Sequence, residues 1–511
     1  MRTKAWILSV MAMLGVFTAT GCVGEDTSAF DESENDDSVG GEADGKADAV
    51  QAATYRSGCG DPIRTGKYAL KGDIITPTGV VMNGYVVVQD EKIAEIRTSS
   101  QGAPAGVGVW DTKGVISPGL IDGHGHVEYN HIPIADLGKR YQNRDQWPGA
   151  RLYKTLVKDP KNAVTAAGIQ CEALRHGEAR GLVGGTTAIQ GTPQTSCVRP
   201  LVRNLEQVNF CRDKVRQNVT GIVGFERSIS GKPSFADSVK ADIAARKVDT
   251  VVVHAGEGID EHARSEWQML KDQGLANENL VMIHATAFTR ADFNEIAAAK
   301  AKIVFSPLSN LLLYGKTTDI PAALDAGVLV SIGADWAPSG SANLLGELKV
   351  ADHVNKRLWN SKVTDQQLLE FATINPAKAF RMDKEVGSIE VGKYADFLVV
   401  KQQTGVSSYR SVINAKPQDV FLVTISGDPL FGTKAAMDTL GKGGDYELID
   451  ACGAERAIDM TVTAKDVSKP SASLMSIETA LKKVNPKLTP VIDCTNDAAL
   501  AAYKGIPALM N

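Results

Sequence analysis

The 511-residue sequence has little that would support a membrane channel, a nucleic-acid-binding protein or a cysteine-based metal site. Beyond one apolar segment at the N-terminus, no stretch is long enough to cross a membrane. None of the seven cysteines is spaced from another as in a zinc knuckle. No basic stripe is present, so we expect no nucleic-acid partner. The apolar fraction of 43% and the charged fraction of 23% are those of a globular protein.

The N-terminus is typical of an exported lipoprotein. Arg2 and Lys4 precede the apolar residues 5–17, and Ala19-Thr20-Gly21-Cys22 resembles a bacterial lipobox. We therefore expect residues 1–21 to be a signal peptide and Cys22 to be lipidated. The protein would then be extracytoplasmic, in the periplasm or on the cell surface, and anchored to a bacterial membrane. An ordinary signal peptide followed by an incidental cysteine, or an uncleaved anchor, are the alternatives.

Residues 22–52 are predicted to form an acidic, disordered tether. Residues 25–50 contain ten acidic side chains and one lysine, with few apolar residues. Such a segment repels itself and buries too little apolar surface to fold. The rest of the chain is close to neutral, although the formal net charge is −5.

Six cysteines remain besides Cys22, and an even number outside the cytoplasm permits disulfides. From proximity in the sequence we expect the pairs Cys197–Cys211 and Cys452–Cys494. Buried free thiols are the alternative.

Two β-rich pieces flank a long central region. Residues 53–115 and 383–440 both consist of short β-branched runs separated by polar turns, which predicts one β-sandwich built from the two flanks. No role can be assigned to residues 441–511. The expected strands are 68–75, 85–88, 92–96, 387–393, 395–400 and 420–425.

Residues 116–382 alternate between apolar runs and amphipathic segments, a pattern of parallel strands covered by helices on both faces. We predict an α/β fold, a (β/α)8 TIM barrel. Thr364 and Gln367 form a capping-box pattern at the start of a late helix. The clearest helices are expected at 261–273, 290–300, 320–326 and 343–358.

The most informative local pattern is His124-Gly125-His126, at the end of an apolar segment. Side chains alternate along a strand, so the two imidazoles point to the same side and form half of a metal site. Two structural histidines on a strand are the alternative.

Three further polar residues each follow a short apolar run: His254, His284 and Asp335. In a barrel, the carboxyl ends of the strands share one face, where the chemistry of barrel enzymes lies. Three histidines and an aspartate suit Zn²⁺ and leave a position for water. We therefore expect His124, His126, His254 and Asp335 to bind one divalent metal, Zn most readily, with Fe as the alternative.

Other residues near these strand ends are candidates for catalysis or substrate binding. Glu257 lies three residues after His254 and could pass a proton to the substrate, or it could be a charge at the start of the next helix. Ser309 and Asn310 end the seventh strand and either shape the pocket or form a plain turn. His131 either lines the pocket or is a loop histidine.

The segment from His131 to Trp147 is where we expect a substrate to be bound and recognised. Its pocket candidates are Arg140, Tyr141, Asn143, Arg144 and Trp147. The remaining histidines lie in polar, helix-like surroundings and are expected at the surface; they are His176, His262 and His353.

The run from Pro118 to His126 resembles the first-strand signature of the amidohydrolase superfamily. Residues 254–257, His284, and residues 306–310, 331–335, 372–377 and 387–396 are similar to its cytosine, triazine and aminated-purine deaminase and chlorohydrolase-like branch. The likeness covers about residues 66 to 430.

The resemblance implies a mechanism. Metal-activated water attacks an sp² carbon, with His284 holding the water, Asp335 accepting its proton and Glu257 protonating the leaving group. Relatives with two metals carry a bridging residue after the fourth strand, taken here as 219–225. That residue is Lys or Glu in those relatives, and here no Lys follows the strand, so one metal is expected; Glu226 leaves two metals as the alternative.

The expected function is therefore hydrolysis of a C–N bond of a small molecule, in deamination or otherwise. The rival hypotheses are an amidase or peptidase-like amidohydrolase acting on an exported substrate, and a binding lipoprotein without turnover. Either a monomer or a homo-oligomer is compatible with the sequence.

Overall fold

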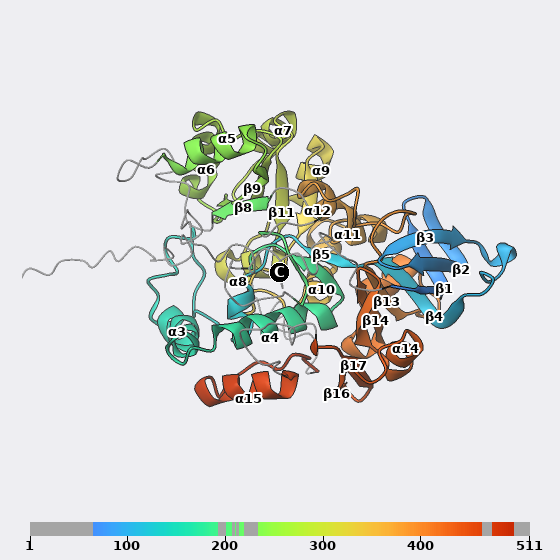
Figure 1. The fold of residues 1–511 in the computed structure, drawn as a ribbon. Helices are drawn as coiled ribbons and strands as arrows, with labels where there is room; N and C mark the ends of the chain where they lie inside the picture. Colours follow the sequence, from blue (N-terminus) through green and yellow to red (C-terminus); the bar gives the residue numbers. More distant parts are fainter. Residues whose placement is uncertain are drawn as a thin grey trace, which may run out of the picture.

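The computed structural model of the protein describes residues 65–192, 201–206, 210, 214–218, 233–461 and 473–494. Eight short parallel strands and their helices form a barrel, and a nine-stranded sheet lies beside it (Figure 1). The predicted TIM-barrel type of fold is confirmed. Both units have apolar cores, and the strands of the barrel carry the candidate functional residues.

The nine-stranded sheet combines both flanks of the barrel, as the sequence predicts. β4 pairs in parallel with β1 and antiparallel with β13, so it joins the two flanks. The spatial order is β16-β17-β15-β14-β13-β4-β1-β2-β3. The strands are β1 Lys67–Thr76, β2 Gly79–Gln89, β3 Lys92–Arg97, β4 Gly108–Pro118, β13 Phe397–Lys401, β14 Val420–Ile425, β15 Asp428–Gly432, β16 Glu447–Asp450 and β17 Glu455–Ile458.

The sheet curls so that its edge strand β3 meets the segment before β13. The Ile93 amide donates to the Lys393 carbonyl at 2.9 Å, and the Ala395 amide donates to the Glu91 carbonyl at 2.9 Å. The strand expected at 387–393 does not form. Gly387 and Gly392 have φ angles of 89° and 91°, so this segment turns instead of extending.

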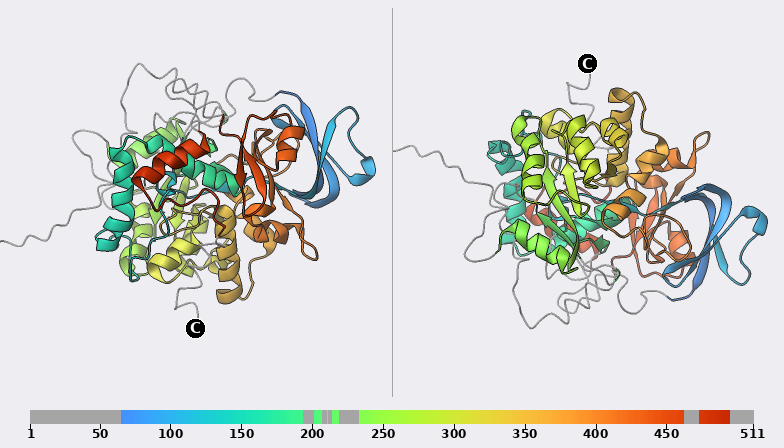
Figure 2. Two further views of the ribbon diagram at one scale, coloured as in Figure 1. Left: turned by 90° about the horizontal axis from the view of Figure 1, so that it is seen from below. Right: turned by 90° about the horizontal axis from the view of Figure 1, so that it is seen from above.

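The C-terminal segment is part of both units. β16 and β17 extend the sheet, and helix α15 (Leu474–Val484) lies along α4 (Gln170–Val183), as Figure 1 and the left view of Figure 2 show. The predicted disulfide Cys452–Cys494 is confirmed. Cys171 is also disulfide-bonded, whereas Cys197 and Cys211 lie outside the described residues.

The barrel strands form one sheet of five and one of three, all parallel. The Gly123 amide donates to the Ile332 carbonyl at 3.1 Å and links the two sheets. The residues expected as the fourth strand, 219–225, and Glu226 lie outside the described residues. The strands are β5 Leu120–Asp122, β6 Thr186–Ile189, β7 Arg203–Asn204, β8 Lys214–Asn218, β9 Val248–Ala255, β10 Leu280–His284, β11 Lys302–Phe305 and β12 Leu329–Ile332.

The predicted helices are found with ends that differ by at most two residues. The capping box at Thr364 and Gln367 is also confirmed. None of the described helices is both long and apolar enough to span a membrane. Besides α4 and α15, the helices are α2 Arg151–Tyr153, α3 Asp159–Ala166, α5 Phe235–Ala244, α6 Glu261–Asp272, α7 Arg290–Ala298, α8 Pro307–Tyr314, α9 Ile320–Ala326, α10 Leu344–Leu358, α11 Asp365–Glu370, α12 Ile374–Ala379, α13 Ser408–Asn414 and α14 Lys434–Thr439.

Candidate metal centre and active site

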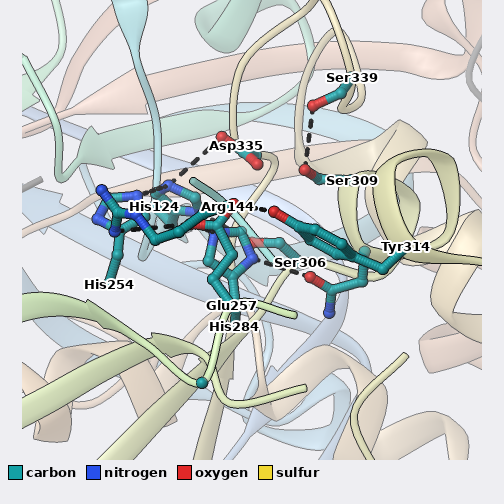
Figure 3. Close-up of polar contacts among 12 residues, drawn as sticks. His124, Arg144, His254, Glu257, His284, Ser306, Ser309, Tyr314, Asp335 and Ser339 are labelled. Atoms are coloured by element: carbon teal, nitrogen blue, oxygen red, sulfur yellow. Dashed lines mark hydrogen bonds and ion pairs between the residues drawn. The ribbon is translucent and has the colours of Figure 1, made fainter. Parts of the chain in front are cut away.

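The histidines expected from the sequence to converge do so at the carboxyl ends of the barrel strands (Figure 3). His124 and His126 follow β5, and His254 is the penultimate residue of β9. Nε2 of His124 lies 3.2 Å from Nε2 of His126 and 3.1 Å from Nε2 of His254. Three imidazole nitrogens therefore share one small volume.

Asp335 joins this group from the loop after β12. Its Oδ1 lies 3.4 Å from Nε2 of His124 and 3.6 Å from Nε2 of His126. The Asp335 amide donates to the His124 carbonyl at 2.8 Å, so the backbones of the two ligand segments are joined directly. Asp335 has a φ of 59°, an unusual conformation for a non-glycine residue. Such a backbone is typical of functional sites.

His284 completes the cluster at the end of β10. It forms a second group of convergent donor atoms with His124 and His254. Its φ of 71° turns the chain out of the strand. Oδ1 of Asn310 lies 2.8 Å from Nδ1 of His284. The other ring nitrogen of His284, Nε2, lies 3.7 Å from Oε2 of Glu257. If Nδ1 carries the proton, Nε2 is free to act in the site.

The side chains of Asp122 and Ser306 form hydrogen bonds that position the cluster. Oδ1 of Asp122 accepts hydrogen bonds from the amides of His124 and Ala334, both at 3.1 Å. Ser306 Oγ lies 2.9 Å from Nδ1 of His124. The sequence interpretation gave Asp122 no role. Its position between an apolar strand and a glycine before the histidine pair was the signal available.

His124 and His126 are held in the neutral form that a metal requires. Burial and the neighbouring imidazoles lower the pKa of His124 well below its usual value. Burial also lowers the pKa of His126 to about 4, although Glu257 opposes the shift. A neutral imidazole nitrogen has a free lone pair, so no proton has to leave before a cation binds.

The aspartate of the cluster needs a cation to stay ionised. Burial raises the pKa of Asp335 well above its usual range, and a hydrogen bond from Ser309 opposes the shift. Ser309 Oγ in turn lies 3.0 Å from Ser339 Oγ (Figure 3). A divalent cation beside the carboxylate would reverse this shift, because it favours the charged form.

Glu257 lies across the site from Asp335 and is surrounded by positive and hydrogen-bonding partners. Oε1 accepts a 2.6 Å hydrogen bond from the hydroxyl of Tyr314, and Oε2 lies 3.7 Å from Nη1 of Arg144. Burial alone would raise the pKa of Glu257, but His284, Arg144 and Tyr314 outweigh it and hold the pKa below its usual value. Glu257 is therefore an ionised carboxylate that can take up a proton.

Aromatic side chains close one side of the site. Trp147 Nε1 donates to the Tyr314 hydroxyl at 3.0 Å, and the Trp147 ring packs 5.6 Å from that of Trp336. The Trp336 ring lies 6.0 Å from that of His126. The sequence selected Trp147 and Arg144 as pocket candidates but gave no reason to select Tyr314 or Trp336.

The structure places the other histidines as follows. His131 lies in a turn and is fully buried, and it forms hydrogen bonds with Asn485 in the segment after α15, which favours the loop alternative. His176 was expected at the surface but is fully buried in α4, because α15 covers that helix. His262 is exposed, as predicted, and pairs with Asp145.

The donor set fits a divalent metal of the zinc type. Imidazole nitrogens and one carboxylate oxygen are ligands that Zn²⁺ and Fe²⁺ both accept. The candidate donor atoms of His124, His126 and Asp335 all lie within 4.8 Å of one another, as do those of His124, His254 and His284. Small shifts of side chains would bring them around one ion.

Comparisons with known proteins agree with this geometry. A profile described as the amidohydrolase family matches residues 115–430. A 5-methylthioadenosine/S-adenosylhomocysteine deaminase of Thermoanaerobacter pseudethanolicus is 33% identical over 147 residues, covering 28% of this chain and 34% of that enzyme. The Moorella thermoacetica protein of that name is 24% identical over 381 residues, covering 66% and 86%.

Most of the curated relatives are matched over about a third to a half of their own length. Among solved structures, a zinc-bound adenosine deaminase from Xanthomonas campestris has a TM-score of 0.54 and 19% sequence identity. That alignment covers 71% of this chain and 92% of the other. At this identity the likeness concerns the fold.

Proposed function

Since this chain belongs to the amidohydrolase family, we propose that it hydrolyses a C–N bond of a small molecule with the help of one divalent metal. The observation that carries the proposal is the convergence of His124, His126, His254 and Asp335 with an ionised Glu257 nearby. Metal-ligand and proton-transfer groups are thus both present in one buried site.

The metal would be held by the three histidines and Asp335. When bound, it makes water more acidic and stabilises negative charge that develops on the substrate. Zn²⁺ is the proposed ion, because it prefers nitrogen and oxygen ligands and needs no redox partner.

The protein's own groups would move the protons. Water adds to the substrate carbon and gives one proton to the carboxylate of Asp335. Glu257, which is ionised at rest, takes up a proton from solvent and delivers it to the leaving nitrogen. The C–N bond breaks, ammonia or an amine is released, and Asp335 returns the proton it accepted to solvent. His284 donates or accepts a hydrogen bond through Nε2 and holds the attacking water in line. Arg144 and Tyr314 keep Glu257 in place for the transfer.

Deamination of a small molecule is the favoured form of this reaction. Relatives matched over part of the chain are named as deaminases, which supports this choice. An amidase acting on an exported substrate is the second candidate, because the N-terminal segment resembles that of a lipoprotein. Release of ammonia rather than of a longer amine separates the two.

We also propose that the enzyme is tethered outside the cytoplasm through a lipid on Cys22. Expression of the full chain and of Cys22→Ser in a bacterial host tests this. The full chain should fractionate with membranes and incorporate a radiolabelled fatty acid, whereas Cys22→Ser should do neither. Equal partition of the two proteins would contradict the proposal.

The catalytic proposal is tested by metal analysis together with a substrate screen monitored for ammonia. Purified protein should contain about one Zn or Fe per chain, and a chelator should abolish turnover. His254→Ala should lose most of the metal and the activity. His262→Ala is the matched control, because this histidine is exposed and paired with Asp145.

Two outcomes would overturn the catalytic proposal. Full activity without a tightly bound metal would exclude the assigned role of the cluster. If His284→Ala and Glu257→Ala bound a ligand as tightly as the unmodified protein, and no compound turned over, a binding lipoprotein would be the better description.

A further inference from the structure

A cavity of about 380 Å³ lies outside the histidine cluster, where the barrel meets the C-terminal segment. It is bounded by the end of α4, the start of α10, the residues that follow Asp335, and residues 489–493. None of the candidate metal ligands is among its lining residues. Its size is that of a small-molecule site.

One wall of this cavity is a buried guanidinium. Arg180, on α4, is only 2% exposed. Its Nη1 donates to the Asn130 carbonyl and, at 3.4 Å, to Thr489 Oγ1. Within the described part of the chain, no residue accepts a hydrogen bond from its Nε. A buried charged donor without an acceptor is costly, so this group favours an anionic partner.

The guanidinium stays charged at neutral pH. Burial lowers the pKa of Arg180 to about 10, and the carboxylate of Asp493 opposes that shift. Asp493 also lines the cavity.

A second positive element comes from α10. Lys349 lines the cavity, and so do Leu345 and Gly346 of the first helical turn. The amino end of this 15-residue helix carries a partial positive charge. Of the lining side chains, Arg180 and Lys349 are cationic and Asp493 is the one carboxylate. Among these lining side chains, cationic groups therefore outnumber carboxylates.

The other walls are mainly apolar. They include Ile134, Val183, Leu345, Val491 and Ile492. A ligand that fits these surroundings has one anionic end and a short hydrocarbon body.

We propose that this cavity is a second binding site, separate from the metal centre, for a small organic carboxylate. The carboxylate group would lie between Arg180 and Lys349, and the hydrocarbon chain would lie against Val183 and Val491. The proposal does not depend on the hydrolase function, because it concerns other residues.

The site is connected to the metal centre through Asn130. The Asn130 carbonyl accepts from Arg180, and its Oδ1 accepts a 2.9 Å hydrogen bond from the amide of Ala337, two residues after Asp335. Ala337 and Gly340 also line the cavity. A bound carboxylate would therefore touch the segment that positions Asp335.

Isothermal titration of the metal-loaded full-length protein with hexanoate tests the proposal, with hexanol as the uncharged probe of similar size. Hexanoate should bind saturably, and hexanol at least tenfold more weakly. Lys349→Gln should weaken hexanoate binding at least fivefold. Asp493→Asn should strengthen it, because a repelling carboxylate is removed; a misfolded variant would not bind more tightly.

The matched control is Lys356→Gln. Lys356 lies near the other end of α10, pairs with Asp352 and does not line the cavity. Its substitution should leave the affinity unchanged. Absence of saturable binding would overturn the proposal. So would equal affinities in Lys349→Gln, Asp493→Asn and the unmodified protein, which is the result expected if hexanoate binds at the metal centre instead.

Discussion

The hydroxyl of Tyr314 donates a 2.6 Å hydrogen bond to Oε1 of Glu257, and Trp147 Nε1 donates at 3.0 Å to the same hydroxyl. Three residues far apart in the sequence therefore form one hydrogen-bonded chain. Because the hydroxyl accepts from Trp147, its proton is directed to Glu257. The orientation of the proposed proton donor is thus fixed by groups that do not react.

Tyr314→Phe should lower kcat about 10- to 100-fold, the effect of losing a hydrogen bond to a charged group. Metal content should not change, because Tyr314 is not a ligand. The control is Tyr446→Phe, which removes a 2.6 Å hydrogen bond to Asp438 in α14, outside the barrel, and should leave kcat unaffected. Steady-state kinetics with a substrate from the ammonia screen decide. Equal kcat for both variants would contradict the role of Tyr314.

Asn310→Ala should reduce activity about 10- to 100-fold, a typical effect of losing a residue that orients a group at a metal site. The side-chain Oδ1 of Asn310 lies 2.8 Å from Nδ1 of His284, and this contact fixes the orientation of the ring. Asn310→Asp keeps an acceptor oxygen and should retain more activity than Asn310→Ala. If both variants lost activity equally, the acceptor oxygen would not be the feature that matters. Metal analysis of each variant shows whether lost activity comes from a misoriented His284 ring, with the metal retained, or from loss of the metal.

Glu178→Gln should make the protein more stable at alkaline pH. Burial raises the pKa of Glu178 from 4.5 to about 8, and its Oε2 accepts a hydrogen bond from the Leu201 amide. Between these values the folded state keeps a proton that the unfolded state has lost, so stability falls as the pH rises. Above about pH 8, Glu178 is ionised in both the folded and the unfolded state, and burying its charge lowers the free energy of unfolding by a constant amount.

Thermal denaturation at several pH values measures this effect. The Tm advantage of Glu178→Gln should grow from pH 5 to pH 8. Its free energy of unfolding should gain about 5 kcal/mol at most, because each unit by which burial raises the pKa is worth about 1.4 kcal/mol. Glu261→Gln is the control, because Glu261 has an exposed side chain. A Tm difference that does not vary with pH would argue against the raised pKa.

Cys452→Ser combined with Cys494→Ser should lower the Tm. The disulfide joins residues 42 positions apart, and closing a loop of that size stabilises the folded chain by about 4 kcal/mol in the chain-entropy description. Either single substitution should cost about as much as the double one. Differential scanning calorimetry without reductant is the measurement, and an unchanged Tm in all three variants would contradict it.

Local patterns were enough to predict most of the expected strands, the expected helices and the convergence of five residues at the candidate metal site. The histidine pair lies at the end of an apolar strand, and His254, His284 and Asp335 each follow another. Parallel strands of a barrel present their carboxyl ends at one face. Convergence therefore followed from the order of apolar runs, before any contact was known.

The surroundings of these residues could not be predicted in the same way. The assignment of His176 to the surface failed because its burial depends on α15, about three hundred residues later in the chain. The surroundings of His131 also depend on a distant segment, because its ring contacts the side chain of Asn485. Local periodicity carries no information about which distant segment will cover a helix.

Chain order and apolar periodicity thus specified the barrel and the residues at its strand ends, since hydrophobic burial and strand alternation act over a few residues. The tertiary structure alone decided the left-handed backbone of His284 and Asp335, the pairing of Tyr314 with Glu257, and the placement of residues 441–494. These features arise from contacts between segments far apart in the chain, and such contacts form only once the whole core has packed.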